Sequence, residues 1–181
     1  FNTDVLKFNF NNLTKKKLVL IGNLPYNISS QILVKLLKTK NIHLKFDDVI
    51  LMFQKELGEK IIGKFPSKNY GRLSIISNFK LRVIKKFLVS PNCFFPKPKV
   101  LSMVIHFKTL KDKKYNIKKV SNLEKVTNVL FSNKRKKINK NIKKLLSVNC
   151  ISKIKELNLD LRPEKIEPKI YYKITELFEK K

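Results

Sequence analysis

The chain has 181 residues, 43% of them hydrophobic, and its 41 basic and 13 acidic side chains give a formal charge of +28. This length suits one domain or one domain with a small appendage, and the apolar content excludes wholesale disorder. No apolar run reaches the roughly 18 residues of a membrane helix. Two distant cysteines, Cys93 and Cys150, exclude a disulfide framework and a cysteine-rich zinc site, so we expect no metal. No signal peptide is visible, and the sequence predicts a cytoplasmic protein.

The net charge predicts a polyanionic partner, with nucleic acid foremost. Only four of the basic residues are Arg, and alanine is absent. That composition is typical of a GC-poor genome, so part of the charge reflects mutational drift on solvated faces. Composition therefore favours nucleic-acid binding without locating the surface that binds.

The first part of the chain alternates between strand and helix patterns. Short apolar runs predict strands, and apolar positions on one face predict helices, the first with Ser29 or Ser30 as a cap. Residues 68–76 are expected to form a turn and a short apolar segment. The expected strands are 17–22, 48–53, 79–89 and 100–107, and the expected helices are 28–37 and 54–62. This alternation predicts an α/β sheet with parallel strands.

The pattern changes after about Lys108 and becomes entirely helical from Ser121 onward. A charged linker is expected at 111–120, and a last helix begins after Pro168. The sequence thus predicts a sheet domain at 1–110 and a small all-helical domain at 121–181. Five cations cluster in the helical part: Lys134, Arg135, Lys136, Lys137 and Lys140.

Asn23-Leu24-Pro25-Tyr26 directly follows a predicted buried strand. As a bare pattern it could be a strand-to-helix turn, yet ligands bind at the carboxyl ends of strands in open α/β sheets. An Asn oxygen and a backbone carbonyl can together hold the two hydrogens of an adenine amine. Proline fixes the carbonyl, and tyrosine can stack on the base. Such a tetrapeptide could serve amine methylation by positioning the amine.

A base extruded from its stack gains from a second aromatic face. Residues 94–100, Phe-Phe-Pro-Lys-Pro-Lys-Val, could supply it from a stiff, proline-rich loop. The alternative is that Phe94 and Phe95 are both core residues and the prolines merely end a strand.

These two segments resemble motifs of the small-subunit rRNA adenine dimethyltransferases. Residues 23–29 resemble N-L-P-Y-N-I-S, and residues 94–100 resemble F-x-P-x-P-K-V. Four further blocks resemble the family in order: Gln54-Lys55-Glu56, Tyr70-Gly71-Arg72-Leu73-Ser74, Phe131-Ser132-Asn133-Lys134-Arg135-Lys136 and Leu161-Arg162-Pro163-Glu164. The resemblance implies the C-terminal part of a Rossmann-like methyltransferase sheet, followed by a small helical rRNA-binding domain.

The resemblance also implies an activity and its partners. The family methylates two adjacent adenines of small-subunit rRNA, each twice on the exocyclic amine, with S-adenosylmethionine as methyl donor. The implied partner is the immature small ribosomal subunit, and the implied role is in subunit maturation. We expect a monomer that does not contact membranes.

Residue roles carry over by matching motif. The implied catalytic residues are Asn23, Leu24, Pro25, Tyr26 and Phe94, with Asn23 and the Leu24 carbonyl orienting the amine and the two aromatic rings enclosing the base. Asp4 and Asn23 are the implied cofactor contacts, and Asp4 would contact the cofactor adenine. The basic cluster 134–140 would contact rRNA phosphates. On stacking alone, Tyr26→Phe should keep most of the activity.

One departure from the family bears on activity. The four glycines, Gly22, Gly58, Gly63 and Gly71, form no G-x-G loop. We therefore expect a sequence that begins about halfway through the cofactor domain and lacks methyltransferase activity by itself. Two alternatives stay open: a large-subunit rRNA adenine methyltransferase of the erythromycin-resistance type, and a non-catalytic RNA-binding factor of ribosome assembly.

Overall fold

The computed structural model describes residues 2–13, 17–111 and 114–181. Residues 112 and 113 of the expected linker, and residues 1 and 14–16 of the expected sheet domain, lie outside this description. The chain forms two compact units, which we call the sheet unit (1–62 and 77–111) and the helical unit (63–76 and 112–181). The segment 63–76, which the sequence prediction assigned to the first domain, groups with the helical unit.

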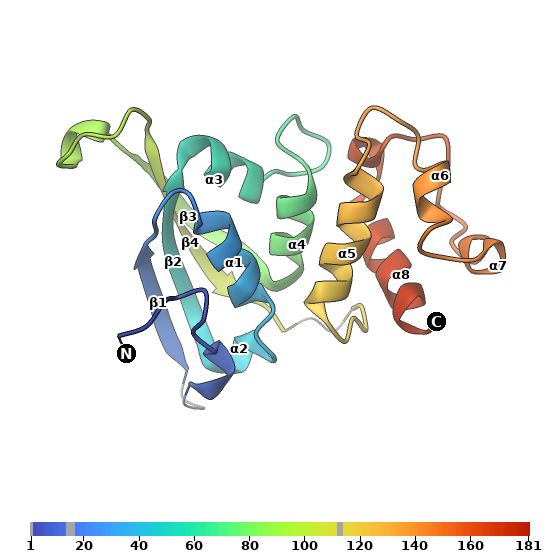
Figure 1. Ribbon diagram of the computed structural model, residues 1–181, viewed down its shortest axis with the longest axis horizontal. Coiled ribbons are helices and arrows are strands. Elements are labelled where there is room, and N and C mark those ends of the chain that lie inside the picture. Colours follow the sequence, from blue (N-terminus) through green and yellow to red (C-terminus); the bar gives the residue numbers. More distant parts are fainter. Residues whose placement is uncertain (1, 14–16, 112–113) are drawn as a thin grey trace. The chain divides into compact units, whose positions relative to one another are not determined.

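The sheet unit contains four strands in the order β1-β2-β4-β3 (Figure 1). They are β1 (Leu18–Asn23), β2 (Phe46–Gln54), β3 (Leu81–Val89) and β4 (Ser102–Thr109). Strands β1 and β2 are parallel, whereas β4 is antiparallel to both β2 and β3. The expectation of parallel strands throughout is therefore wrong for β3 and β4. These two strands follow one another without a crossover helix, and such strands pair as a hairpin.

The helices of the sheet unit match the predicted ones in part. They are η1 (Phe10–Asn12), α1 (Ser29–Leu37), α2 (Ile42–Lys45), α3 (Lys55–Ile61), the end of α4 (Arg72–Lys80) and η2 (Pro91–Cys93). Helix α1 buries the apolar face predicted for it, but the predicted serine cap is wrong. Its N-cap residue is Ile28, and Ser29 Oγ instead donates to the Tyr26 carbonyl oxygen (3.0 Å).

Helix α4 (Arg72–Lys80) replaces the expected turn and apolar segment, and it ends where a strand was expected to begin. Ile75, Ile76 and Phe79 are buried, but serine and asparagine lie between them. Polar residues among the apolar ones blur the helical periodicity, so a short sequence window gives no clear signal. Strand β3 consequently begins at Leu81, two residues later than predicted.

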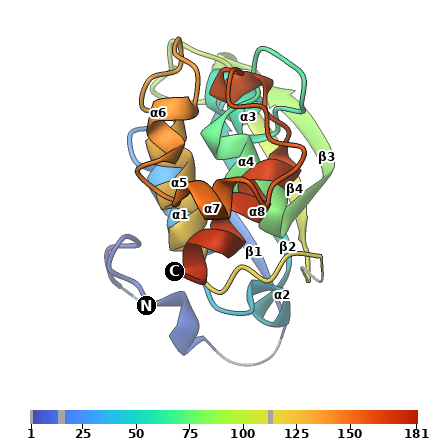
Figure 2. The ribbon, with the colours of Figure 1, turned by 90° about the vertical axis from the view of Figure 1, so that its right-hand side faces the viewer.

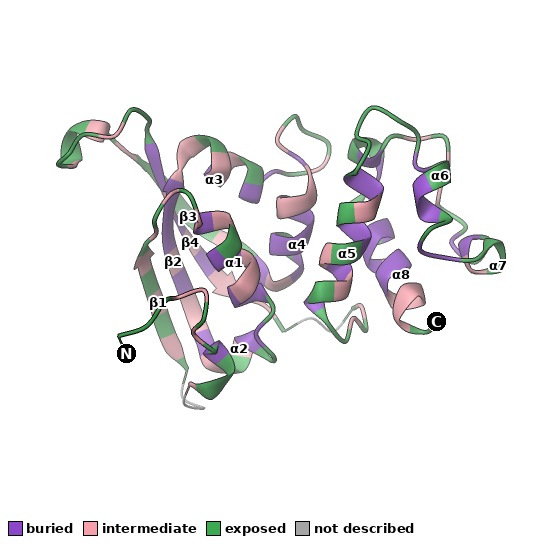
Figure 3. Ribbon diagram, viewed as in Figure 1, coloured by how far each residue is buried: buried purple, intermediate pink, exposed green. Residues whose placement is uncertain are grey.

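One face of the sheet carries a charged cluster. Side chains alternate along β1, where Val19 and Ile21 are exposed (Figure 3). On the same face, His106 Nε2 lies 2.7 Å from Asp48 Oδ1, and Lys108 Nζ lies 3.3 Å from Asp48 Oδ2. The hydrogen bond with His106 lowers the pKa of Asp48, so this carboxylate stays ionised at neutral pH.

Helices α5 and α8 pack together in the helical unit (Figure 2). The elements of this unit include α5 (Val120–Phe131), α6 (Asn139–Ile142), α7 (Val148–Ile151), η3 (Pro163–Lys165) and α8 (Pro168–Glu179). The rings of Phe131 on α5 and Tyr171 on α8 are stacked, with centroids 5.6 Å apart. The helical character expected for 121–181 is confirmed in the described residues.

Two of the family-like blocks serve packing in the helical unit. The Tyr70 hydroxyl donates to the Ile166 carbonyl, and the Tyr171 hydroxyl donates to the Pro163 carbonyl, both at 2.7 Å. Burial raises the pKa of both tyrosines, so both remain donors. One residue of each block, Tyr70 in 70–74 and Pro163 in 161–164, thus takes part in a hydrogen bond that packs the helical unit.

The longest helices of the described structure, α5 and α8, have 12 residues each. No helix in residues 2–13, 17–111 or 114–181 is long and apolar enough to cross a membrane. The same residues contain no group of three His, Cys, Asp or Glu side chains that could hold a metal ion.

Candidate active site

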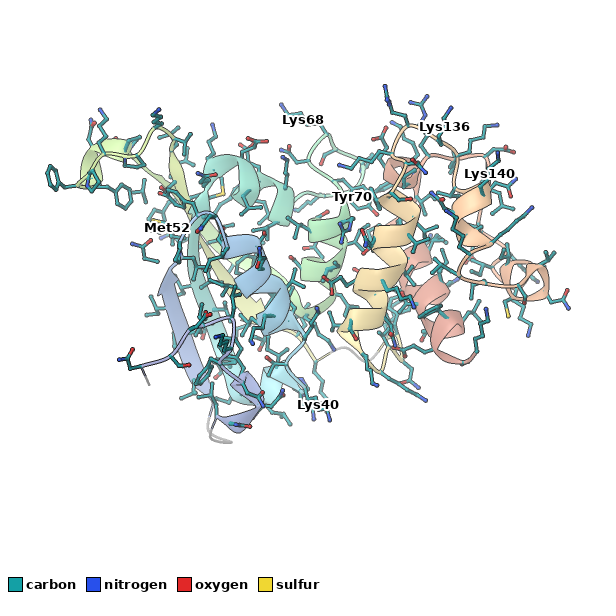
Figure 4. All side chains as sticks on the ribbon, in the orientation of Figure 1. Lys40, Met52, Lys68, Tyr70, Lys136 and Lys140 are labelled. Carbon is teal, nitrogen blue, oxygen red and sulfur yellow. The ribbon has the colours of Figure 1, made fainter. Side chains whose placement is uncertain are left out.

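The sheet topology brings the two candidate segments to one edge. Parallel strands β1 and β2 end there together, with Asn23 paired to Met52. Antiparallel β4 begins at the same edge, where Ser102 pairs with Gln54. The loop 24–28 leaves β1 at this edge, and the loop 90–101 enters β4 there. Met52, labelled in Figure 4, marks the position.

A cavity of about 380 Å³ lies between these loops. This volume falls in the range of small-molecule sites. The lining residues come from both loops: Asn23, Leu24, Pro25, Tyr26, Phe94, Phe95, Pro96 and Pro98. The structure therefore brings together all five residues that the sequence analysis named as catalytic, although the two segments are some 70 positions apart in the chain.

Hydrogen bonds in the loop after β1 determine which carbonyls a ligand can use. The Pro25 carbonyl accepts from the amide of Ile28 (3.2 Å), and the Tyr26 carbonyl accepts from Ser29 Oγ (3.0 Å). Both bonds form the turn into α1. Of these loop carbonyls, the one of Leu24 is therefore the candidate for a ligand, and the exposed Asn23 side chain stands beside it.

Gly22 allows the chain to pack closely just before the tetrapeptide. A Cβ at this position would lie 3.0 Å from Leu51 Cδ2 and 3.1 Å from Leu24 Cδ2. Both distances are shorter than ordinary van der Waals contact. The missing side chain thus lets Leu24 pack against the end of the sheet.

Tyr26 is held at both ends. Its carbonyl accepts from Ser29, and its hydroxyl lies 2.6 Å from the hydroxyl of Ser102 on β4. Ser102 is fully buried, and it pairs with Gln54 of β2 on one side and Val89 of β3 on the other. The ring of Tyr26 is therefore connected to the centre of the sheet at the cavity wall.

Phe94 and Phe95 are not core residues, so that alternative is wrong. Phe94 is half-buried, and Phe95 is fully exposed, with 101% relative accessibility. Both rings line the cavity, and the peptide bond between Phe95 and Pro96 is cis. The motif resemblance predicted a stacking role for Phe94 alone. The adjacent aromatic residue was a visible signal for Phe95, but the sequence could not show which ring faces the cavity.

Asp4 is outside this cavity, unlike Asn23. Its side chain is exposed, and Oδ1 accepts from the amide of Leu6 (2.8 Å). Its carbonyl accepts from the amides of Lys7 and Phe8. One carboxylate oxygen of Asp4 therefore stabilises a local turn.

The basic cluster lies between α5 and α6 and at the start of α6. All five residues, Lys134, Arg135, Lys136, Lys137 and Lys140, are exposed. Lys136 and Lys140 extend away from the helices (Figure 4). Lys137 Nζ lies 2.9 Å from Asp160 Oδ1, so part of its charge is balanced within the helical unit.

Comparison with known proteins identifies the family. The family model described as "Ribosomal RNA adenine dimethylase" matches residues 1–180. Proteins named "Ribosomal RNA small subunit methyltransferase A" are 38% identical to this chain in Pelagibacter ubique, over 98% of the chain, and in Malacoplasma penetrans, over 96%. The chain spans 68% and 63% of the lengths of these two relatives.

Solved structures share the fold. A dimethyladenosine transferase from Plasmodium falciparum aligns over 99% of this chain and 72% of its own, with a TM-score of 0.77 and 24% identity. The 23S rRNA methyltransferase ErmE aligns over 99% of this chain and 71% of its own, with a TM-score of 0.65 and 16% identity. The expected Rossmann-like methyltransferase fold is thereby confirmed. From the family model and these relatives, we conclude that the chain belongs to the ribosomal RNA adenine dimethylase family.

Proposed function

We propose that this chain carries the adenine-binding cavity and an rRNA-docking surface of an enzyme that dimethylates two adjacent adenines of small-subunit rRNA. The observation that carries the proposal is the single cavity lined by Asn23, Leu24, Pro25, Tyr26 and Phe94. The names of the relatives in Pelagibacter and Malacoplasma support the small subunit as the site of action.

The cavity suits an adenine amine because it offers acceptors beside aromatic faces. The amide oxygen of Asn23 and the carbonyl of Leu24 would each accept one amine hydrogen, which directs the nitrogen lone pair out of the ring plane. Pro25 restricts the backbone that presents the carbonyl. Tyr26 and Phe94 would enclose the extruded base. The chemistry is then positioning and hydrogen bonding, not covalent catalysis.

S-adenosylmethionine is the methyl donor of this family. The two implied contacts are compatible with it. An ionised carboxylate has about four acceptor sites, so Asp4 can bind Leu6 and also accept from the amine of the cofactor adenine. Asn23 is exposed at the cavity and would be the second contact of the cofactor. When bound, the cofactor supplies an electrophilic methyl group, and the residues of this chain orient the amine that receives it.

The exposed cluster 134–140 would dock rRNA by contacting phosphates, which positions an enzyme without reading sequence. The proposed partner is the immature small ribosomal subunit. We propose that the protein binds it as a monomer in the cytoplasm. The fold shared with ErmE keeps a large-subunit substrate as the competing possibility.

The test is a chimera in which these 181 residues replace the matching segment of the Pelagibacter ubique relative. We expect it to convert adenines of immature small subunits to N6,N6-dimethyladenine, detected by mass spectrometry of digested rRNA. Protein-free large-subunit rRNA should remain unmodified. Modification of the large-subunit RNA alone would favour the erythromycin-resistance type. Binding to small subunits without methylation would favour an assembly factor.

A further inference from the structure

We infer that Ser102 is a positioning residue that fixes the ring plane of Tyr26 for stacking on the target base. This inference rests on the proposed function, because it assigns a task within the same cavity. Its basis is the distance of 2.6 Å between the two hydroxyl oxygens, which join residues 76 positions apart.

Ser102 is suited to this task because it is immobile. It is fully buried, and β4 is paired on both sides at this position. The preceding residue is fixed as well, since the Leu101 carbonyl accepts from the amide of Lys55 (2.9 Å). A hydroxyl on such a strand has a defined position at the carboxyl ends of β1 and β2.

Tyr26 by itself would be free to turn. It lies in the turn between β1 and α1 and is half-buried, and its ring lines an open cavity. The bond from Ser29 fixes the backbone of Tyr26 but not the ring. The bond with Ser102 fixes the far end of the ring, which removes rotational freedom before the base arrives. Stacking on a ring that is already oriented loses less entropy on binding.

The same bond makes a simple stacking account incomplete. If the ring only supplied a face, Phe at position 26 would serve as well as Tyr. Because the hydroxyl is bonded to a buried serine, Tyr26→Phe leaves the Ser102 hydroxyl without this partner, and the ring loses its anchor. We therefore expect Tyr26→Phe to be impaired, contrary to the expectation from stacking alone.

The test measures stability and chemistry separately in the chimera described above. Tyr26→Phe and Ser102→Ala should each lower the single-turnover rate of methyl transfer about tenfold, the effect of losing one ordinary hydrogen bond. Affinity for the immature subunit should be unchanged. Ser102→Thr keeps the hydroxyl and should stay within about twofold of the wild type. Ser152→Ala, at an exposed position of the helical unit, is the control for the loss of a serine hydroxyl outside the cavity.

The double variant Tyr26→Phe/Ser102→Ala distinguishes positioning from mere packing. It leaves no buried hydroxyl unpaired, so it should regain the thermal stability lost in the singles. Its methyl-transfer rate should nevertheless remain as low as in either single variant. Recovery of the rate together with the stability would overturn the inference, and so would a wild-type rate in Tyr26→Phe. If the unsubstituted chimera fails to methylate, it is the proposed function that fails.

Discussion

Asn23 and Phe94 both line the cavity, and we propose a different task for each of them. Asn23, at the end of β1, offers a polar group at the cavity, and Phe94 offers an apolar face from the opposite loop. Both groups reach the cavity because the two residues lie at the same edge of the sheet. Substitutions at the two positions should therefore affect different steps, chemistry for Asn23 and base capture for Phe94.

The first prediction concerns the aromatic face. Phe94→Ala in the chimera should raise the concentration of RNA needed for half-maximal methylation about tenfold, because stacking contributes roughly 1–3 kcal/mol per base. Phe94→Tyr keeps the ring and should be close to wild type. Phe95→Ala should have a smaller effect, since that ring is fully exposed and less restrained. A larger effect at Phe95 than at Phe94 would reverse the assignment of the stacking residue.

The sequence was informative for residues whose chemistry is carried by a contiguous motif. Asn23, Leu24, Pro25 and Tyr26 are neighbours in the chain, and the structure places all four at one cavity. Ser102 could not be found in this way. Its role depends on a hydrogen bond across 76 positions, and a serine at the start of a strand carries no local signal.

At the scale of elements, the loop 63–70 before α4 depends on a glycine. A Cβ at Gly63 would lie 2.3 Å from the Asn69 carbonyl oxygen and 2.9 Å from the Tyr70 amide nitrogen. Neither backbone atom can move without displacing Tyr70, whose hydroxyl is bonded to the Ile166 carbonyl. The glycine is therefore required by packing and not by a positive φ angle.

The second prediction follows from this contact. Gly63→Ala should lower the melting temperature of the 181-residue chain by about 5 °C or more, as strain against the backbone costs on the order of 1–3 kcal/mol. Gly71→Ala is the matched control, because a Cβ there would meet nothing within 4 Å, and it should shift the melting temperature by about 1 °C at most. Equal shifts in thermal unfolding by circular dichroism would contradict the packing argument.

Elements were predictable where the apolar pattern was regular. The pattern gave α1 and β2 close to their observed bounds, and it gave the start of α8 near Pro168. It failed for α4, where polar residues interrupt the apolar ones, and for the direction of β3 and β4. Direction depends on the connection between strands, and a loop of proline and phenylalanine does not reveal by composition that it closes a hairpin.

At the scale of the whole molecule, the net charge of +28 comes from two groups of basic side chains, those proposed to bind RNA and those that are only solvated. The cluster 134–140 is exposed in one short region of the helical unit. Other lysines are scattered over both units. Only a cluster can place several cations on neighbouring phosphates, so the two groups should differ in the salt dependence of RNA binding.

The third prediction measures this difference. Changing Lys134, Arg135, Lys136 and Lys137 to Gln should reduce the slope of log affinity against log salt concentration by about 3, since each phosphate contact contributes somewhat less than 1. The control variant changes four exposed lysines outside the cluster to Gln, namely Lys7, Lys40, Lys64 and Lys68, and has the same net charge. If both variants reduce the slope equally, the cluster is only part of a generally basic surface.

The division of the chain into units was less accessible from sequence than the identity of the elements. The sequence pattern changes after about Lys108, and the sheet unit ends at Lys111. The inclusion of 63–76 in the helical unit depends on long-range bonds of Tyr70 to Ile166 and of Tyr172 to Ile75, which no local pattern records. The sequence pattern thus indicated a change of character in this region of the chain but not that the segment 63–76 groups with the helical unit.

The most direct test of the account is the single-turnover rate of methyl transfer by the Asn23→Ala chimera on immature small subunits, with subunit binding measured in parallel. Removing an acceptor that orients the amine should lower the rate about 10²- to 10³-fold. Binding should be nearly unchanged, because the docking that we propose relies on the cations of the helical unit and not on Asn23. A wild-type rate in Asn23→Ala would mean that Asn23 is only a turn residue and that the cavity at the end of β1 is not where the adenine is methylated.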